Sequence, residues 1–269
     1  MLLRRVTEHV KAQNWLAVGL DFIIVVMGVF MGIQVSNWNQ SVFDQKSETD
    51  YLEQLQRDLQ DTQLEVREQI AFEQFHIDLA DAVFEMISVG PTADKGLQIG
   101  MGLTELGARR TLKVESPTFL EMQGAGNLGI ISDQNLRAAI ISYSFYTRRL
   151  ESAIDKNNEF YIDKAFNDFA RNAGIQFRLW DDSIMGQQLP RTMQLISEND
   201  QGQTIPPLFN VDDILMTSPP DAKIWNEIVQ QISWRAGISR ANEGLAQQLM
   251  DATLELDAKI TQYRDGERR

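Results

Sequence analysis

The amino-acid sequence predicts an all-α protein in which an N-terminal transmembrane helix continues into an elongated antiparallel helical bundle. Residues 15–38 form an apolar stretch long enough to cross a bilayer. After it, apolar residues recur at helical spacing over long stretches, and the alternation typical of strands is scarce. We therefore expect long helices over about 41–89, 133–173 and 219–264, whose matched lengths suit an antiparallel bundle.

The predicted transmembrane helix contains one charged residue, Asp21, and has a tryptophan at each border. At 1.5 Å per residue, Trp15 and Trp38 lie about 34 Å apart, which matches the hydrocarbon core with its interfaces. We predict that these two tryptophans anchor the helix at the membrane interfaces. A cleaved signal peptide is the alternative, but the apolar run is too long for one and no A-x-A-like site precedes Asn39. We expect an uncleaved signal anchor.

The charges around the span predict its orientation. The segment before it is basic on balance, with Arg4, Arg5 and Lys11 against Glu8, and the segment after it is acidic, with Asp44, Glu48 and Asp50 against Lys46. The positive-inside rule then places residues 1–14 in the cytoplasm as a short stub. Residues 39–269 are expected to form a single periplasmic domain of a bacterial inner-membrane protein.

Composition narrows the classes of function and partner. The 269 residues include no cysteine and carry a formal net charge of −13. The lack of cysteine suits an exported bacterial domain and excludes cysteine zinc sites, thiol nucleophiles and disulfides. So acidic a chain is repelled by nucleic acid and by anionic lipid headgroups. We expect the span to contact the lipid bilayer and the chain to bind another membrane or periplasmic protein, a second copy of itself included.

The first bundle helix is predicted from an apolar stripe that runs from Leu52 to Met86. No proline or glycine interrupts this stretch before Gly90-Pro91, so the helix is expected to continue the membrane helix directly. A heptad spacing holds for about two repeats and then drifts. This drift favours packing in a core over a free coiled coil.

Turn and cap signals divide the rest of the chain. The glycine-rich region from Gly90 to Gly107 is expected to be broken. Ser116 followed by Pro117 predicts a short helix that ends near Gly124 to Gly126, and Asp133 is expected to cap the next long helix.

Residues 175–220 contain five prolines and are the least regular part of the chain. Ile175 to Trp180 is either a short strand or simply extended. The last long helix is expected to start near Ser218-Pro219.

Four residues of the span, Asp21, Gly28, Gly32 and Ser36, are spaced by seven, four and four positions and so fall near one helical face. Gly28 and Gly32 form a G-x-x-x-G pair, which lets helix backbones approach closely. We predict that this face binds another transmembrane segment. Two interpretations of Asp21 stay open: it either pairs with a polar group of that segment or lies hydrated or protonated near the headgroups.

The sequence shows no motif of catalysis or metal binding: it lacks H-E-x-x-H, G-x-S-x-G, P-loop and EF-hand patterns. His76 lies within a helical stretch and is expected to be a surface or hydrogen-bonded histidine rather than a ligand. Asp181-Asp182 and Asp212-Asp213 lack the spacing of a calcium loop and are expected to be solvated. We predict that the protein is not an enzyme and binds no metal or cofactor.

Two further features have more than one interpretation. Arg109-Arg110 and Arg148-Arg149 could meet an anion, but in so acidic a chain we expect them to pair with nearby carboxylates. The turn from Pro117 to Leu136 gathers small, apolar and polar residues between helices. It is either a capped turn of purely structural use or the border of a ligand pocket.

The N-terminal motifs resemble those of a widespread uncharacterised family of bacterial single-pass membrane proteins. The residues that carry the resemblance are Gln13-Asn14-Trp15, Asp21-Phe22, Gly28, Gly32 and Asn37-Trp38-Asn39, followed by Tyr51-Leu52, Pro117-Thr118, Gly126-Asn127-Leu128 and Leu136-Arg137. The resemblance implies an inner-membrane protein with no assigned activity, and it supplies no catalytic residues. Residues 175–269 carry no part of it.

Together these observations predict a membrane-anchored interaction module that binds another protein or supports an envelope assembly. The alternative is a sensory or ligand-binding domain that signals through its membrane helix to a partner. Only about 14 residues are expected inside the cell, too few for an output domain, and this favours the interaction module.

Overall fold

The computed structural model describes residues 15–91, 93–177 and 214–267. Every regular element in these ranges is a helix, so the predicted all-α class is confirmed. In chain order the elements are α2 (Trp15–Ser88), α3 (Ala93–Leu106), α4 (Pro117–Gly124), the 3₁₀ turn η1 (Asn127–Ile130), α5 (Gln134–Asn157), the π-helical segment η2 (Asn158–Phe166), α6 (Asn167–Asn172), α9 (Ile214–Thr217) and α10 (Lys223–Glu267).

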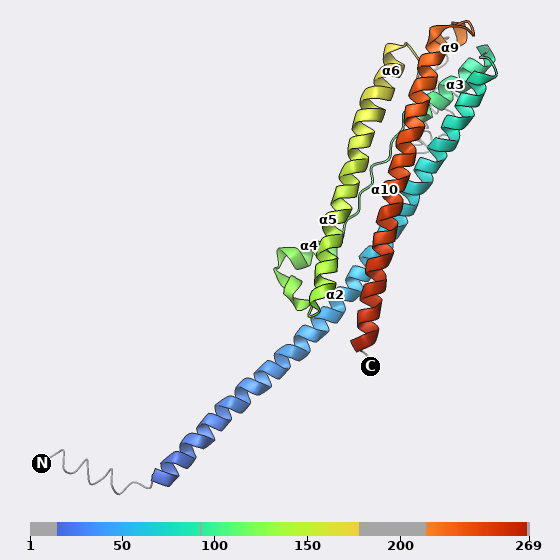
Figure 1. Ribbon diagram of the computed structural model, residues 1–269. Helices are drawn as coiled ribbons and strands as arrows, with labels where there is room; N and C mark the ends of the chain where they lie inside the picture. The colour runs from blue at the N-terminus through green and yellow to red at the C-terminus, as the bar shows by residue number, and fades with distance from the viewer. Residues whose placement is uncertain (1–14, 92, 178–213, 268–269) are drawn as a thin grey trace, which may run out of the picture.

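Helix α2 is a single helix of 74 residues that joins the apolar segment to the bundle, as expected. At 1.5 Å per residue it is about 110 Å long, and it leaves the bundle as a separate stem (Figure 1). It ends where Gly90 adopts a φ of 102°, a left-handed conformation that favours glycine, just before Pro91. The predicted end near residue 89 is therefore confirmed.

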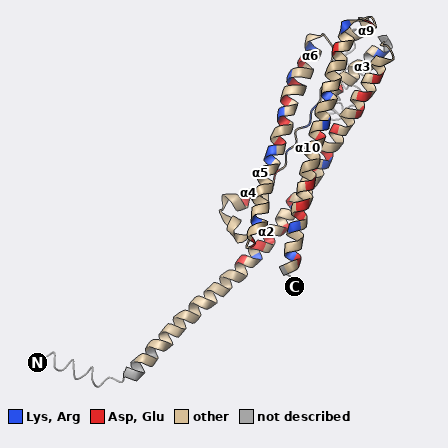
Figure 2. Ribbon diagram, in the orientation of Figure 1, with Lys and Arg blue, Asp and Glu red and all other residues tan. Residues whose placement is uncertain are grey.

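Within the described ranges, α2 is the single helix that is long and apolar enough to cross a membrane, and its apolar part lies in the stem. Its apolar window is not covered by any other part of the described chain. Figure 2 shows the contrast in charge: residues 22–38 of the stem carry no acidic or basic side chain, whereas acidic and basic residues are spread along the bundle helices.

The bundle consists of α2, the continuous run α5–η2–α6, and α10. Three apolar clusters order them along the axis. The first joins Leu52, Leu136 and Ile260, the second joins Val66, Ile154 and Ala246, and the third joins Val83, Phe166 and Ile228. Residue numbers rise together in α2 and α5–η2 and fall in α10. Helix α10 is thus antiparallel to both others, while α5 runs parallel to α2.

Residues 107–116 explain this parallel arrangement. They form no regular element and carry the chain from α3, at the far end of the bundle, back toward the stem before α5 begins (Figure 1). Leu112 is fully buried within the second cluster. This extended return was not predicted from the sequence.

Helices α2 and α10 each bury side chains in a strict heptad pattern. Eleven buried positions follow one another in α2 by alternating steps of three and four: Leu52, Leu55, Leu59, Thr62, Val66, Gln69, Glu73, His76, Ala80, Val83 and Ile87. Eleven follow the same steps in α10: Trp225, Ile228, Ile232, Arg235, Ser239, Asn242, Ala246, Leu249, Thr253, Leu256 and Ile260. The expected drift of the heptad in α2 was wrong, because polar side chains occupy buried positions of the same register.

The π-helical segment shifts the buried face of the third helix by one residue. After Ile154, the heptad would bury Asn157 and Tyr161 next; the buried residues are instead Asn158 and Ile162. Segments with i→i+5 hydrogen bonds make this shift because they add a residue to the turn. Tyr161 is consequently 41% exposed.

The region between Gly90 and Gly107 was expected to be broken, and this expectation was wrong, because residues Ala93–Leu106 form helix α3. Its glycines permit close contacts instead of breaking the helix. A Cβ at Gly102 would lie 2.4 Å from Val83 Cγ2, and one at Gly96 would lie 2.6 Å from the carbonyl oxygen of Leu215. Only a residue without a side chain fits at these two positions.

The predicted caps of the two following helices are confirmed. The Ser116 hydroxyl accepts a hydrogen bond from the Phe119 amide at 3.2 Å, with proline at the start of α4. Asp133 accepts from the Leu136 amide at 2.6 Å at the start of α5. Helix α10 begins at Lys223, a few residues later than expected, because the chain first turns at Pro219, whose carbonyl accepts hydrogen bonds from the Ala222 amide and the Trp225 indole.

Candidate functional site

The predicted interaction face of the stem is uncovered by the described chain. Gly28, Gly32 and Ser36 are exposed, and a Cβ at either glycine would meet nothing within 4 Å. Trp38 is 67% exposed. Asp21 and Trp15 lie within α2, but their side chains lie outside the described residues. The structure thus puts the whole face on one uninterrupted helix.

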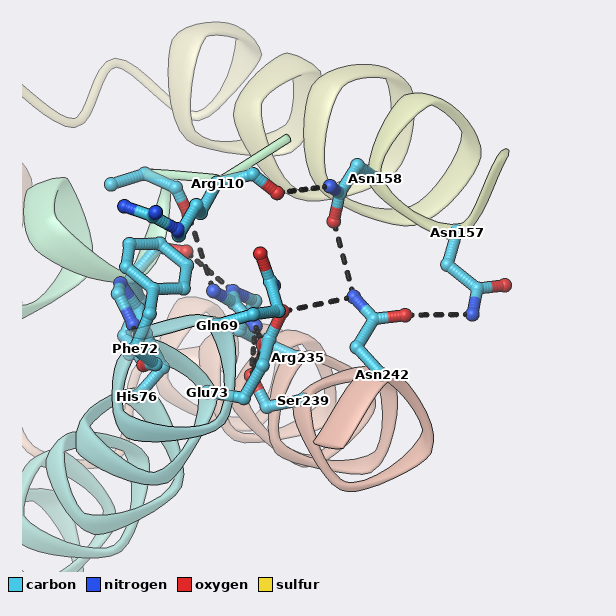
Figure 3. A network of polar contacts seen from close by, with 12 residues as sticks. Gln69, Phe72, Glu73, His76, Arg110, Asn157, Asn158, Arg235, Ser239 and Asn242 are labelled. Atoms are coloured by element: carbon cyan, nitrogen blue, oxygen red, sulfur yellow. Dashed lines mark hydrogen bonds and ion pairs between the residues drawn. The ribbon is translucent and has the colours of Figure 1, made fainter. Parts of the chain in front are cut away.

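The bundle contains a second notable feature, a layer of buried polar side chains near its middle. Figure 3 shows this polar layer, which is contributed by α2, α10, η2 and the start of the extended segment. Its core members are Gln69, Glu73 and His76 from α2, Arg235, Ser239 and Asn242 from α10, and Asn158 from η2. Each of them is at most 2% exposed.

A buried ion pair lies at the centre of the layer. Arg235 Nη1 lies 3.8 Å from Glu73 Oε2, and both side chains are fully buried. Ser239 links the two charges: its hydroxyl donates to Glu73 Oε2 at 2.8 Å and accepts from Arg235 Nη1. Buried ions are tolerated when paired and fully hydrogen-bonded, so Glu73 is the charge that permits Arg235 to be buried.

Arg235 serves the backbone at the end of α3. Its Nε donates to the Leu106 carbonyl at 2.7 Å, and its Nη2 donates to the Ala108 carbonyl at 3.1 Å. The last carbonyls of a helix have no partner within that helix, and a cation stabilises this negative end of the helix dipole. The arginine therefore caps α3 at the point where the helix ends and the extended segment begins.

Asparagines extend the network to η2. Asn242 Nδ2 donates to Glu73 Oε1 and to Asn158 Oδ1, both at 3.2 Å. Asn158 Nδ2 donates in turn to the Arg110 carbonyl at 2.9 Å, and Asn157 donates to Asn242 Oδ1 at 2.8 Å. The shift made by the π-helical segment is what brings Asn158 to the interior.

His76 is a buried, hydrogen-bonded histidine, in agreement with one of the two expected roles. Its Nδ1 lies 2.8 Å from the Phe72 carbonyl and its Nε2 lies 3.0 Å from the Glu105 carbonyl. Burial and then the positive charge of Arg235 lower the pKa of His76 to about 4. The ring is neutral near pH 7 and donates one hydrogen bond.

The acidity of Glu73 results from opposing effects. Burial raises the pKa of Glu73, while Arg235 and the hydrogen bonds from Ser239 and Asn242 counteract that rise. Burial likewise lowers the pKa of Arg235 to about 10, against the attraction of Glu73. Since the layer is closed to solvent, its geometry is suited to fixing the register of four chain segments rather than to handling a substrate.

A cleft of about 460 Å³ lies closer to the stem, between α2, residues 113–116, α4 and α5. It borders the turn from Pro117 to Leu136 that the sequence singled out. Two of its carboxylates hold the backbone in place. Asp58 accepts from the Ser116 hydroxyl at 2.8 Å and the Thr118 amide at 3.0 Å, and Glu151 accepts from the Val114 amide at 2.5 Å.

The paired arginines behave in two ways. Arg110 Nη2 lies 2.9 Å from Glu65 and 2.7 Å from Glu68, and Arg109 lies 3.1 Å from Asp163, as expected. Arg148 and Arg149 form no ion pair within the described ranges, so the expected pairing was wrong for them. Their guanidinium groups instead lie over aromatic rings, 5.9 Å from Phe145 and 5.0 Å from Tyr146.

No group of three or more potential metal-ligating side chains occurs in the part of the chain that the structure describes. Asp181-Asp182, Asp212-Asp213 and residues 178–180 of the predicted extended segment lie outside that part. No protein-family model, curated protein or solved structure matches the chain. The resemblance of the N-terminal motifs to an uncharacterised membrane family therefore stays a prediction.

The sequence reasoning missed the polar layer. Arg235, Ser239 and Asn242 stand at the same heptad positions as the isoleucines and leucines of α10. The signal in the sequence is that these polar residues continue the heptad spacing of the apolar ones. Apolar residues alone leave gaps at these positions, and for that reason the stripe in α2 is discontinuous when polar residues are left out.

Proposed function

We propose that the protein is an interaction module of the bacterial inner membrane, in which α2 crosses the bilayer and holds a periplasmic helical bundle. The observation that carries this proposal is the continuity of α2. One helix presents the uncovered Gly28, Gly32 and Ser36 face in the stem and then forms one side of the bundle interior. A partner bound to the stem would thereby be joined rigidly to the bundle.

The chemistry of the stem supports a helical partner. Small residues let two transmembrane helices approach until their backbones are in van der Waals contact. Asp21 lies near the same face of the helix as the two glycines. A carboxylate within a membrane span is stabilised by a polar group on a second helix. The partner is another membrane protein or a second copy of this chain.

The test is affinity purification of the full chain in mild detergent, followed by mass spectrometry. The double variant Gly28→Ile with Gly32→Ile blocks close approach, and Asp21→Ala removes the charge. Gly19→Ile is the matched control, because nine residues place Gly19 on the opposite side of the helix and a Cβ there also meets nothing within 4 Å.

We expect the same membrane protein to be recovered with wild type and with Gly19→Ile, and to be lost from the double variant. Asp21→Ala should weaken its recovery. Equal recovery with the double variant and the control would contradict an interface on this face of the stem.

A sensory or ligand-binding domain is the second candidate function. The observation that favours it is the cleft of about 460 Å³ near the stem. A ligand there would contact α2 directly, through Leu55, Asp58 and Leu59, and could alter the helix that continues into the membrane.

A further inference from the structure

Between the apolar span and the bundle, α2 has a short segment that no other part of the described chain covers. Every residue from Asn39 to Lys46 is exposed. Trp38 and Phe43 are 67% and 66% exposed, and Val42 is 51% exposed. Large apolar side chains that gather on an uncovered surface are typical of an interaction site.

The uncovered segment continues a heptad spacing that begins in the span. Six exposed residues follow one another by alternating steps of three and four: Val25, Gly28, Gly32, Val35, Asn39 and Val42. We call these six residues the seam. Their spacing is that of positions a and d in a left-handed coiled coil, and most membrane helices pack with the same hand. The seam therefore joins the glycine pair to residues beyond Trp38.

The seam and the bundle use different faces of α2. The next position of the seam register is Lys46, and the first buried residue of the described helix is Glu48. Two residues correspond to about 200° around a helix. No described residue of the bundle therefore covers the seam, and the stem stands apart from the bundle helices (Figure 1).

The residues that flank the seam are complementary to themselves. With Asn39 at position a and Val42 at position d, Trp38 occupies position g and Phe43 occupies position e. In two parallel helices, the g residue of one faces the e residue of the next heptad in the other. Trp38 of each copy then contacts Phe43 of the other copy, which gives two aromatic contacts by symmetry.

The polar residues of the register also suit a second copy. The amide of Asn39 both donates and accepts, and an asparagine at position a specifies the register and the oligomeric state of a coiled coil. Asp21 stands one heptad before Gly28, and two carboxyl groups that meet at one depth do not both ionise, so they share a proton. Lys46 would bring two like charges together, so the seam ends at Val42.

We propose that the stem binds a second copy of this chain, as a parallel two-stranded coiled coil from Val25 to Val42. The inference rests on the proposed interaction face of the stem and names its partner. That partner has to be a helix that continues without a break beyond the span and carries an aromatic residue on each flank. Helix α2 itself has both properties.

The test is disulfide crosslinking of the full chain in membranes. The chain has no cysteine, so one introduced thiol reports on one position. Asn39→Cys and Val42→Cys place the thiol in the seam, where the Cα atoms of two copies come within reach of a disulfide. Asn37→Cys is the matched control, because it replaces the same residue type on the opposite side of the same exposed turn.

We expect oxidation to convert Asn39→Cys and Val42→Cys to a covalent dimer and to leave Asn37→Cys mostly monomeric. Two differently tagged forms of one variant, expressed together, show that both halves of the dimer are this chain. Equal crosslinking at the control position, or no covalent dimer at either seam position, would overturn the inference.

The aromatic contact has a separate test. Phe43→Ala, added to Asn39→Cys, should raise the protein-to-lipid ratio needed for half-maximal crosslinking roughly tenfold. Phe30→Ala should leave that ratio unchanged, because Phe30 lies on the side of the helix away from the seam. Equal effects of the two substitutions would contradict the contact between Trp38 and Phe43, and with it the proposed register.

Failure of this inference is distinct from failure of the interface on the stem. If purification recovers a different membrane protein that depends on Gly28 and Gly32, and no covalent dimer forms, the interface stands and the second copy is excluded. If neither a covalent dimer nor such a protein is found, the interface itself is contradicted.

Discussion

The two halves of the continuous helix α2 differ in exposure: the stem half is uncovered, whereas the bundle half is buried along one face. In the stem, every described side chain from Phe22 to Trp38 is exposed, and no segment among the described residues covers the face with Gly28 and Gly32. In the bundle, eleven positions of the same helix are buried in strict register, and even the charge of Glu73 is paired. The bundle half is covered by other helices of the chain, and Gln69 Oε1 is a buried atom there with no hydrogen-bond partner in the described residues. We therefore assign specific recognition to the stem and to surfaces such as the cleft.

The largest expected effect comes from breaking the buried pair. Arg235→Met leaves Glu73 as an unpaired buried charge and removes the donors to Leu106 and Ala108. We expect a loss of about 3–5 kcal/mol in the free energy of unfolding, measured by chemical denaturation followed by circular dichroism. The double variant Glu73→Leu with Arg235→Met should recover part of that loss; if it is no more stable than the single variant, the ion pair is not what makes Arg235 necessary.

The pH dependence of stability should depend on His76. Its pKa is about 4 in the folded protein, below the ordinary value of 6.5, so the unfolded chain takes up the proton first. Stability is therefore lost as pH falls from about 6.5 to about 4, by up to roughly 3 kcal/mol. The raised pKa of Glu73 has the opposite sign and acts above 4.5, so that folding gains stability from it as pH falls.

The His76→Gln variant separates these two contributions. The amide can still donate to the Glu105 carbonyl but does not titrate. Denaturation curves between pH 7 and pH 4 should then become flatter than those of wild type. An unchanged slope would mean that His76 does not carry this dependence.

A smaller effect is expected at the cap of α5. Asp133→Ala removes the acceptor for the Leu136 amide and should cost about 1 kcal/mol. Asp133→Asn, which keeps an acceptor, is the matched control in the same denaturation experiment. Equal losses from the two variants would show that the hydrogen bond is not the cause.

The smallest expected effect on bundle stability is that of the stem. Gly28→Ile with Gly32→Ile should change the stability of the bundle by less than about 0.5 kcal/mol, because no described residue of the bundle touches these glycines. Thermal unfolding of the full chain in detergent measures this. A clear shift would mean that the stem and the bundle are not independent in stability.

The parts of the fold that depend on local chemistry could be predicted from the sequence. The continuity of α2 follows from the lack of glycine and proline before Gly90, apart from the glycines of the apolar stem, and the caps at Ser116 and Asp133 follow from short polar side chains. These signals lie within a few residues of the structure that they determine.

The parts of the fold that depend on contacts between distant residues could not be predicted from the sequence. Helix α3 contains glycines because Val83 and Leu215 lie against them, and neither neighbour is evident from the local sequence. The parallel course of α5 depends on the extended return through residues 107–116, and the shift at Asn158 depends on one added residue in the π-helical turn. The polar layer depends on α3, on the extended return and on the shift at Asn158. Its side chains donate hydrogen bonds to carbonyls at the end of α3 and in the extended segment.

The proposed role of the stem is tested most directly by photocrosslinking in cells. A benzoylphenylalanine placed in turn at each residue from 24 to 36 except the two glycines, where a large side chain would itself block close approach, reports which side of the helix touches protein. The account predicts protein adducts at the positions that flank the glycine face, 25, 29, 35 and 36, and none on the side of Phe30. Adducts spread evenly around the helix, or none with any protein, would contradict it.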